Sequence, residues 1–368
     1  MTSNLDELPD GIPVTVLTGF LGSGKTTLLA HLLRDPALKD TAVIINEFGE
    51  IGLDHHLIEQ VKGEVVVMES GCVCCTIRSD LGNTLRSLYL RRARGEVPAF
   101  KRVVIETTGL ADPAPIVQLL IEDPLVEAYY RLDGIIATVD AVNGKWQLFT
   151  EPHAVKQVAV ADRVVLTKTD LASREAVIEI AGQIQALNPG APLVLALHGQ
   201  VASAALFNVG LYDPTTKSVD VQRWLRDEAY AAQNARDDAH DHGHAHDPVP
   251  DHGGRAVGRH DARIASTCLT ATDPLDWDGF SSWLDRLLAE RGADILRVKG
   301  ILNVTGEDRP VVIHGVQHLF HPPARLASWP DDDRRSRLVF ITRDLDRATL
   351  ERGFAAHREP TGLPAAPA

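Results

Sequence analysis

The chain lacks any apolar run approaching the roughly 20 residues that a membrane-spanning helix requires. Its first residues, MTSNLDELPDG, show neither a basic start nor an apolar core, so we expect no signal peptide. Both absences favour a cytoplasmic protein without a membrane partner. Basic residues are also outnumbered, because 37 Lys and Arg stand against 50 Asp and Glu and give a formal net charge of −13. Since binding to phosphate backbones needs a basic surface, we expect no nucleic-acid partner.

Cysteine is scarce, with four residues in a chain of 368. Three of the four, Cys72, Cys74 and Cys75, lie together in GCVCCTIR, too close for an ordinary disulfide framework. Clustered thiols in a reducing compartment bind metal or carry out redox chemistry. Thiolates on one turn are soft ligands suited to Zn²⁺ and also to Co²⁺ or Cu(I). Cys72 and Cys75 also form a C-x-x-C pair, so a redox pair stays open as an alternative.

Residues 12 to about 198 alternate short apolar strands with longer amphipathic segments. The strands are β-branched and almost continuously apolar, which is typical of parallel strands buried on both faces. We therefore predict a doubly wound α/β domain with a mostly parallel sheet. The expected strands are 12–18, 42–46, 64–68, 102–106, 134–140, 163–168 and 192–197, and the clearest expected helices are 26–33, 80–93 and 173–187.

The composition changes between residues 237 and 260, which read DDAHDHGHAHDPVPDHGGRAVGRH and show no apolar periodicity. Such a stretch predicts a mobile linker. Apolar patterning then returns, with expected strands at 263–270, 294–304, 310–316 and 337–342 and a helix at 277–289, and indicates a smaller α+β domain. The expected division is an N-terminal tail at 1–11, the main domain with the metal site at 12–230, a His-rich linker at 231–262, the smaller domain at 263–356 and a disordered tail at 357–368.

The segment GFLGSGKT follows the first expected strand and leads into a helix, and it matches the phosphate-loop pattern G-x4-G-K-[ST]. Glycines let the backbone wrap around phosphates, and the helix N-terminus adds positive potential. Lys25 is expected to reach the β- and γ-phosphates, and the Thr26 hydroxyl to bind Mg²⁺. The predicted nucleotide-binding residues here are Gly19, Gly22, Ser23, Gly24, Lys25, Thr26 and Thr27.

The segment TKTD, directly after the strand expected at 163–168, predicts which base is bound. The Asp170 carboxylate can accept hydrogen bonds from N1–H and N2–H₂ of guanine, whereas adenine leaves it unpaired. Thr167 and Lys168 complete this segment, although guanine-binding proteins usually carry Asn where Thr167 stands. An ordinary turn in which Asp170 caps a helix is the alternative.

The segment VVIETTG ends another strand with an acid, Glu106, followed by Gly109. Glu106 is expected to orient Mg²⁺ or its water shell, and the Gly109 N–H to approach a γ-phosphate. Catalysis then depends on positioning and charge neutralisation by Lys25, Thr26, Glu106 and Gly109. Helix capping is the alternative role for this acid.

Five segments, GFLGSGKTTL, INEFGEIGLD, GCVCCTIR, ETTGLADP and TKTDL, resemble in order and spacing the CobW-type metallochaperone GTPases. These are relatives of the nickel-insertion GTPases of urease and hydrogenase maturation, and RVKGILNV and HGVQHLFHPPARLASW resemble the family's C-terminal domain. The resemblance implies a metal site at the cysteines and a switch region at NEFGEIGLD. Glu47 or Glu50 would complete the ligands; some relatives carry a further carboxylate where this chain has Ile45.

The resulting hypothesis is a GTPase that binds zinc and hands it to a client metalloprotein in a nucleotide-gated way. The alternatives are a cobalt accessory factor for cobalamin synthesis or metalloenzyme maturation, and a metal-storage protein. A homo-oligomer stays open. The linker histidines are expected to bind divalent ions weakly or to be a merely solvated surface. They are His240, His242, His244, His246, His252 and His260.

Overall fold

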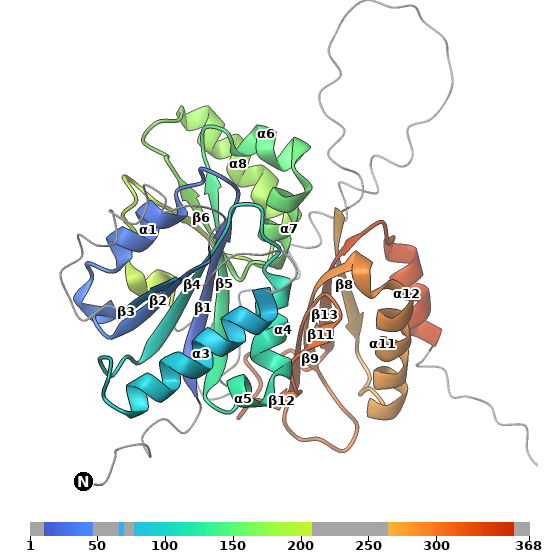
Figure 1. Cartoon of the computed structure of the whole chain (residues 1–368). Coiled ribbons are helices and arrows are strands. Elements are labelled where there is room, and N and C mark those ends of the chain that lie inside the picture. The colour runs from blue at the N-terminus through green and yellow to red at the C-terminus, as the bar shows by residue number, and fades with distance from the viewer. Residues whose placement is uncertain (1–10, 47–65, 70–76, 208–263, 357–368) are drawn as a thin grey trace, which may run out of the picture. The chain divides into compact units, whose positions relative to one another are not determined.

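The computed structural model describes residues 11–46, 66–69, 77–207 and 264–356 (Figure 1). The chain divides into two compact units, Met1–Asp220 and Val221–Ala368. Among the described residues, no helix combines the length and the apolar character needed to span a membrane.

The first unit is built on a seven-stranded sheet in the order β3-β2-β4-β1-β5-β6-β7, and all of its strand pairs are parallel. Every strand therefore ends at the same edge. From β1 the chain moves outward to β2 and β3, returns to β4 beside β1, and then continues to β5, β6 and β7 on the other side. Ligands of such sheets bind at the carboxyl edge where the winding reverses, here beside β1. The strands are β1 (Ile12–Gly19), β2 (Thr41–Asn46), β3 (Val66–Glu69), β4 (Arg102–Thr107), β5 (Tyr130–Asp140), β6 (Arg163–Thr167) and β7 (Leu193–Leu195).

Helices cover both faces of this sheet (Figure 1). On one face, Leu28 and Leu32 of α1 pack in a buried cluster with Val43 and Val104. A second cluster joins α7 and α8 to alternate residues of β5 and β6. The predicted doubly wound fold is confirmed. The helices of this unit are α1 (Lys25–Leu32), α3 (Ile77–Ala93), α4 (Ala114–Glu122), α5 (Pro124–Glu127), α6 (Gly144–Thr150), α7 (Pro152–Val160) and α8 (Arg174–Leu187), with 3₁₀ turns at Pro36–Leu38 and Ser203–Ala205.

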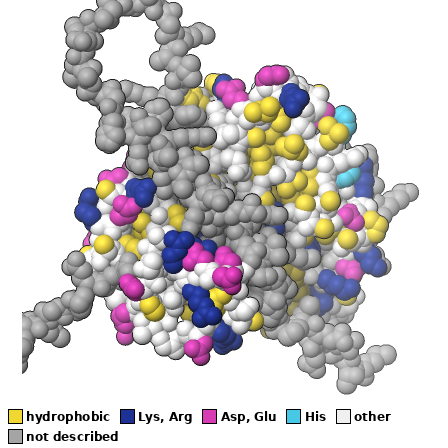
Figure 2. Space-filling model, turned by 180° about the vertical axis from the view of Figure 1, so that it is seen from behind, with side chains coloured by type: hydrophobic (Ala, Val, Ile, Leu, Met, Phe, Trp, Pro, Cys, Tyr) yellow, Lys and Arg dark blue, Asp and Glu magenta, His cyan; other side chains and the backbone are white. Residues whose placement is uncertain are grey.

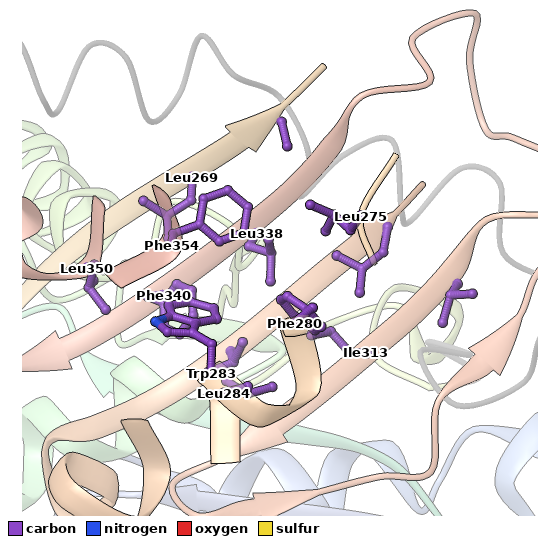
Figure 3. Close-up of a cluster of buried hydrophobic side chains, with 14 of the residues drawn as sticks. Leu269, Leu275, Phe280, Trp283, Leu284, Ile313, Leu338, Phe340, Leu350 and Phe354 are labelled. Atoms are coloured by element: carbon purple, nitrogen blue, oxygen red, sulfur yellow. The ribbon is translucent and has the colours of Figure 1, made fainter. Parts of the chain in front are cut away.

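The second unit contains an antiparallel sheet in the order β11-β10-β9-β13-β8, with β12 paired to β10. Helices α11 and α12 pack Phe280, Trp283 and Phe354 against the sheet residues Leu338 and Phe340 (Figure 3). The predicted small α+β domain is confirmed. Its elements are β8 (Ile264–Ala271), α11 (Trp277–Arg291), a 3₁₀ turn (Gly292–Asp294), β9 (Ile295–Leu302), β10 (Val311–Val316), β11 (Leu319–Phe320), β12 (Ala324–Arg325), β13 (Ser336–Arg343) and α12 (Arg347–Ala356).

The start of β5 differs from the prediction. We expected this strand at 134–140, but it begins at Tyr130 and includes the charged residues Arg131 and Asp133. Asp133 is almost fully buried, and it accepts hydrogen bonds from Thr15 Oγ1 at 3.1 Å and Arg102 Nη1 at 3.2 Å. Because neighbouring strands satisfy this carboxylate, the polar segment joins the sheet.

The surface of the described chain carries charges of both signs. Figure 2 shows Lys and Arg side chains interspersed with Asp and Glu on the face that it displays, and apolar side chains gathered in one part of this face. Leu171, Trp146 and Ile178 are among the most exposed large apolar residues, at 70%, 63% and 61%.

Candidate nucleotide site

The phosphate loop lies where β1 ends and α1 begins, at the carboxyl edge of the sheet. Three of its glycines have positive φ angles, 141° at Gly19, 71° at Gly22 and 88° at Gly24. At Gly19 a Cβ atom would lie only 2.2 Å from Thr138 Oγ1, so a larger residue cannot fit there. This glycine-dependent geometry lets a loop backbone follow the oxygens of a phosphate group.

Lys25 is buried at the start of α1, and its Nζ donates to the carbonyl oxygens of Gly19 at 3.1 Å and Phe20 at 3.3 Å. The ammonium thus lies against the loop that leads into its own helix. Ser23 Oγ lies 2.6 Å from Thr138 Oγ1, which ties the loop to β5. Hydrogen bonds therefore hold the predicted phosphate loop in place, and the Lys25 ammonium lies beside it.

Thr26 and Glu106, expected to bind Mg²⁺, are in direct contact. The Thr26 hydroxyl donates to Glu106 Oε1 at 2.6 Å, although the two residues are 80 positions apart. β4 pairs with β1 in a register that sets Glu106 opposite Leu17, and this brings its carboxylate to the phosphate loop. A hydroxyl and a carboxylate are oxygen ligands of the type Mg²⁺ prefers, so this pair fits the ion.

Gly109 also lies at the phosphate loop. A Cβ atom at this position would come within 2.6 Å of the backbone nitrogen of Leu21, so only glycine permits so close an approach. The segment after β4 and the segment after β1 are therefore packed backbone to backbone.

The predicted base-recognition segment lies beside the same loop. Thr167 Oγ1 is 2.6 Å from Ser23 O and 3.1 Å from Val139 O, so its hydroxyl joins the segment to the phosphate loop. This contact gives Thr167 a structural reason to stand where asparagine is usual. Lys168 has a φ angle of 55°, and its Nζ donates to Asp140 Oδ2 at 2.8 Å.

Asp140 is a buried site residue that we did not predict. Burial alone would raise its pKa, but hydrogen bonds from Lys168, the Asn143 side chain and the backbone N–H groups of Val142 and Asn143 lower the pKa below its ordinary value. The carboxylate therefore stays ionised at neutral pH and fixes Lys168. The sequence could have indicated this residue, because Asp140 ends an expected strand with an acid, as Glu106 does.

Asp170 lies next to His198, another residue that the sequence did not single out. The His198 backbone N–H points to Asp170 Oδ1 at 3.4 Å, and its Nδ1 lies 3.1 Å from Oδ2. The following residue, Gly199, packs against Thr27 of α1, since a Cβ there would lie 3.3 Å from its side chain. The loop after β7 thus approaches both the base-recognition segment and α1.

The predicted metal ligands Cys72, Cys74, Cys75, Glu47 and Glu50 lie outside the described residues, as do the linker histidines. Within the described ranges, no group of three or more His, Cys, Asp or Glu side chains is placed to hold a metal. The strands that precede these predicted ligands, β2 and β3, are described in part or in full. β2 ends at Asn46 and β3 at Glu69, and both strands run parallel to β4, whose last two residues include Glu106.

This loop and this sheet define a P-loop nucleotide-binding protein. Residues 13–195 match the family model of the CobW/HypB/UreG nucleotide-binding domain, and residues 264–358 match that of the CobW C-terminal domain. The chain belongs to the CobW/HypB/UreG family, as its motifs predicted.

Curated relatives match almost the whole chain. The zinc chaperone YjiA of Escherichia coli K12 is 32% identical over 348 residues, which cover 95% of this chain and 99% of YjiA. The zinc chaperone CobW of a Sinorhizobium species is 28% identical and covers 94% of this chain and 97% of its own. The crystal structure of Zn(II)-bound YjiA GTPase superposes with a TM-score of 0.66 at 28% identity, over 95% of this chain and 99% of that one.

Proposed function

We propose that this chain is a GTP-hydrolysing metallochaperone that binds zinc and transfers it to a client metalloprotein. The observation that carries the proposal is the convergence of Lys25, Thr26, Glu106 and Gly109 on one phosphate loop. Two relatives that match nearly the full chain are named zinc chaperones, which supports zinc as the cargo.

The contacts of the site indicate how these residues would act on GTP. Lys25 would exchange the carbonyls of Gly19 and Phe20 for phosphate oxygens. Thr26 and Glu106 would hold Mg²⁺, which neutralises charge on the β- and γ-phosphates. The Gly109 segment, packed against Leu21, would contact the γ-phosphate and so differ between the GTP and GDP states.

Zinc would be bound by the thiolates of Cys72, Cys74 and Cys75, with Glu47 or Glu50 as a further ligand. The parallel arrangement supports this, because β2 and β3 end at the edge of the sheet that carries the phosphate loop. The residues between Asn46 and the cysteines would then connect the two sites. We also propose that the histidines of residues 240–260 bind additional metal weakly.

Phosphate release from GTP and from ATP, with Mg²⁺ and with or without Zn²⁺, tests the enzymatic part of the proposal. We expect GTP to be hydrolysed, ATP to be hydrolysed much more slowly and zinc to change the rate for GTP. If GTP is hydrolysed no faster than in buffer, the chain is not a GTPase.

Asp170→Asn is expected to reduce the preference for GTP over ATP by at least about tenfold, because the amide cannot accept both guanine N–H groups. Competition binding with GDP and ADP measures this preference. His198→Ala is the matched control, since it removes the neighbouring imidazole and keeps the carboxylate, and it should retain the preference. An Asp170→Asn protein with the wild-type preference would show that guanine is recognised elsewhere.

A further inference from the structure

Gln157 on α7 contacts the segment that carries Gly109. Its side chain is buried with only 1% of the residue exposed, and its Nε2 donates to Gly109 O at 3.2 Å and Ala111 O at 2.9 Å. Ala111 N in turn donates to Thr108 O at 3.1 Å, which closes a turn. A single amide group from α7 thus holds two carbonyls of this turn.

A second contact ties the same segment to the same helix. Lys156, next to Gln157, forms an ion pair with Asp112. Asp112 Oδ1 also accepts a hydrogen bond from Ala114 N at the start of α4 at 3.0 Å. Because Gly109 packs against Leu21, the contacts run without a gap from α7 through the turn to the phosphate loop.

Packing alone does not account for glutamine at position 157. The residues around it on α7, Ala154, Val158 and Ala159, are apolar and buried. Within the described chain, Gln157 Oε1 is buried and accepts no hydrogen bond. Burying an amide oxygen without a donor destabilises a fold, so an apolar residue would be preferred if the position only filled space. What glutamine adds is an amide nitrogen with two hydrogens, one for each carbonyl.

We propose that Gln157 is a positioning residue for GTP hydrolysis, which fixes the turn at Gly109 against the phosphate loop without touching the nucleotide itself. The inference rests on the proposed GTPase function. By holding the carbonyls on either side of Leu110, Gln157 restricts the turn to one orientation at the γ-phosphate. Loss of the two bonds leaves the nucleotide pocket intact but lets the turn depart from that orientation.

Gln157→Leu tests the proposal, because leucine has a similar size and donates no hydrogen bond. We expect kcat for GTP to fall at least about tenfold, while KM and the Kd values for GTP and GDP change less than about twofold. Gln157→Met is the second variant, because methionine has a similar length, adapts to an irregular buried space and has no hydrogen to donate. It should show the same split between kcat and KM, and it replaces the leucine variant if that one does not fold.

Asn188→Leu is the matched control. The buried Asn188 Nδ2 lies within 3.2 Å of the carbonyl oxygens of Val158, Ala159 and Ala161, so it also binds α7 and its C-terminus through an amide, but away from Gly109. This variant should lower the melting temperature and leave kcat unchanged when measured well below that temperature.

The results distinguish a failure of the positioning role of Gln157 from a failure of the proposed GTPase function on which it rests. Wild-type protein without GTP turnover overturns the proposed function. Wild-type turnover together with a Gln157→Leu kcat within twofold of it, or a defect confined to Kd, overturns the positioning role. An equal kcat loss in Asn188→Leu also overturns it, because the effect would then follow from loosening α7 in general.

Discussion

Lys25→Ala is expected to lower GTP turnover roughly 100-fold or more, in line with the loss of one preorganised charge contact in a transition state. In the structure the Lys25 ammonium lies against the Gly19 and Phe20 carbonyls, at the loop that would hold the phosphates. Alanine leaves the developing charge on the γ-phosphate without this cation. Phosphate release at saturating GTP, together with the Kd for GDP, measures the effect.

Lys145→Ala provides the control for the change in net charge. Lys145 belongs to the same unit, but it is exposed and pairs with Glu179 between α6 and α8. Its removal should leave turnover unchanged, and both variants should keep the wild-type circular dichroism spectrum. Normal turnover in Lys25→Ala would mean that the phosphate loop is not the hydrolytic site.

The sequence predicted the strands that place the site, because a buried parallel strand has a strong apolar pattern that depends little on its neighbours. Glu106 could be found because it ends such a strand. Helices α4 to α7 were not predicted. α5 and α6 have only four and seven residues, too few for a clear helical period, and α7 follows directly on α6 with only Glu151 between them. Gln157 was missed together with its helix.

His198 could not be found from sequence because its contact with Asp170 arises only when the loop after β7 meets the loop after β6. No local pattern marks either residue as a partner of the other. At Thr167 the structure explains a residue that the sequence left unexplained. Threonine in place of the usual asparagine weakened the prediction of guanine binding, and the contact of its hydroxyl with Ser23 O gives this difference a physical reason.

The double substitution Cys74→Ser and Cys75→Ser is expected to weaken zinc binding at the tight site by about 100-fold or more. Loss of a group that only hydrogen-bonds a metal ligand already weakens metal sites by about 10- to 100-fold, and here two proposed thiolate ligands are replaced by hydroxyls. GTP binding should stay close to normal. Competition against a chelator of known zinc affinity measures the effect, and the release of protons on zinc uptake should shrink with it.

Affinity, rather than the presence of zinc, is the decisive readout here. A YjiA variant with one glutamate and two cysteines replaced by alanine is itself Zn(II)-bound in its crystal structure. Cys268→Ser is the matched control, because this cysteine lies on β8 of the second unit and should not affect tight zinc binding. If the double variant holds one zinc as tightly as the wild type, the tight site lies elsewhere in the chain.

In the proposed mechanism, one conformational change links the nucleotide site to the metal site. The zinc affinity of the full chain, measured with a non-hydrolysable GTP analogue, with GDP and without nucleotide, shows whether this link exists. Coupled sites in proteins typically change one another's affinity by about 5- to 150-fold. We expect a difference in this range between the analogue and GDP, and its loss in Lys25→Ala. Equal zinc affinities in all three states would contradict a nucleotide-gated metallochaperone.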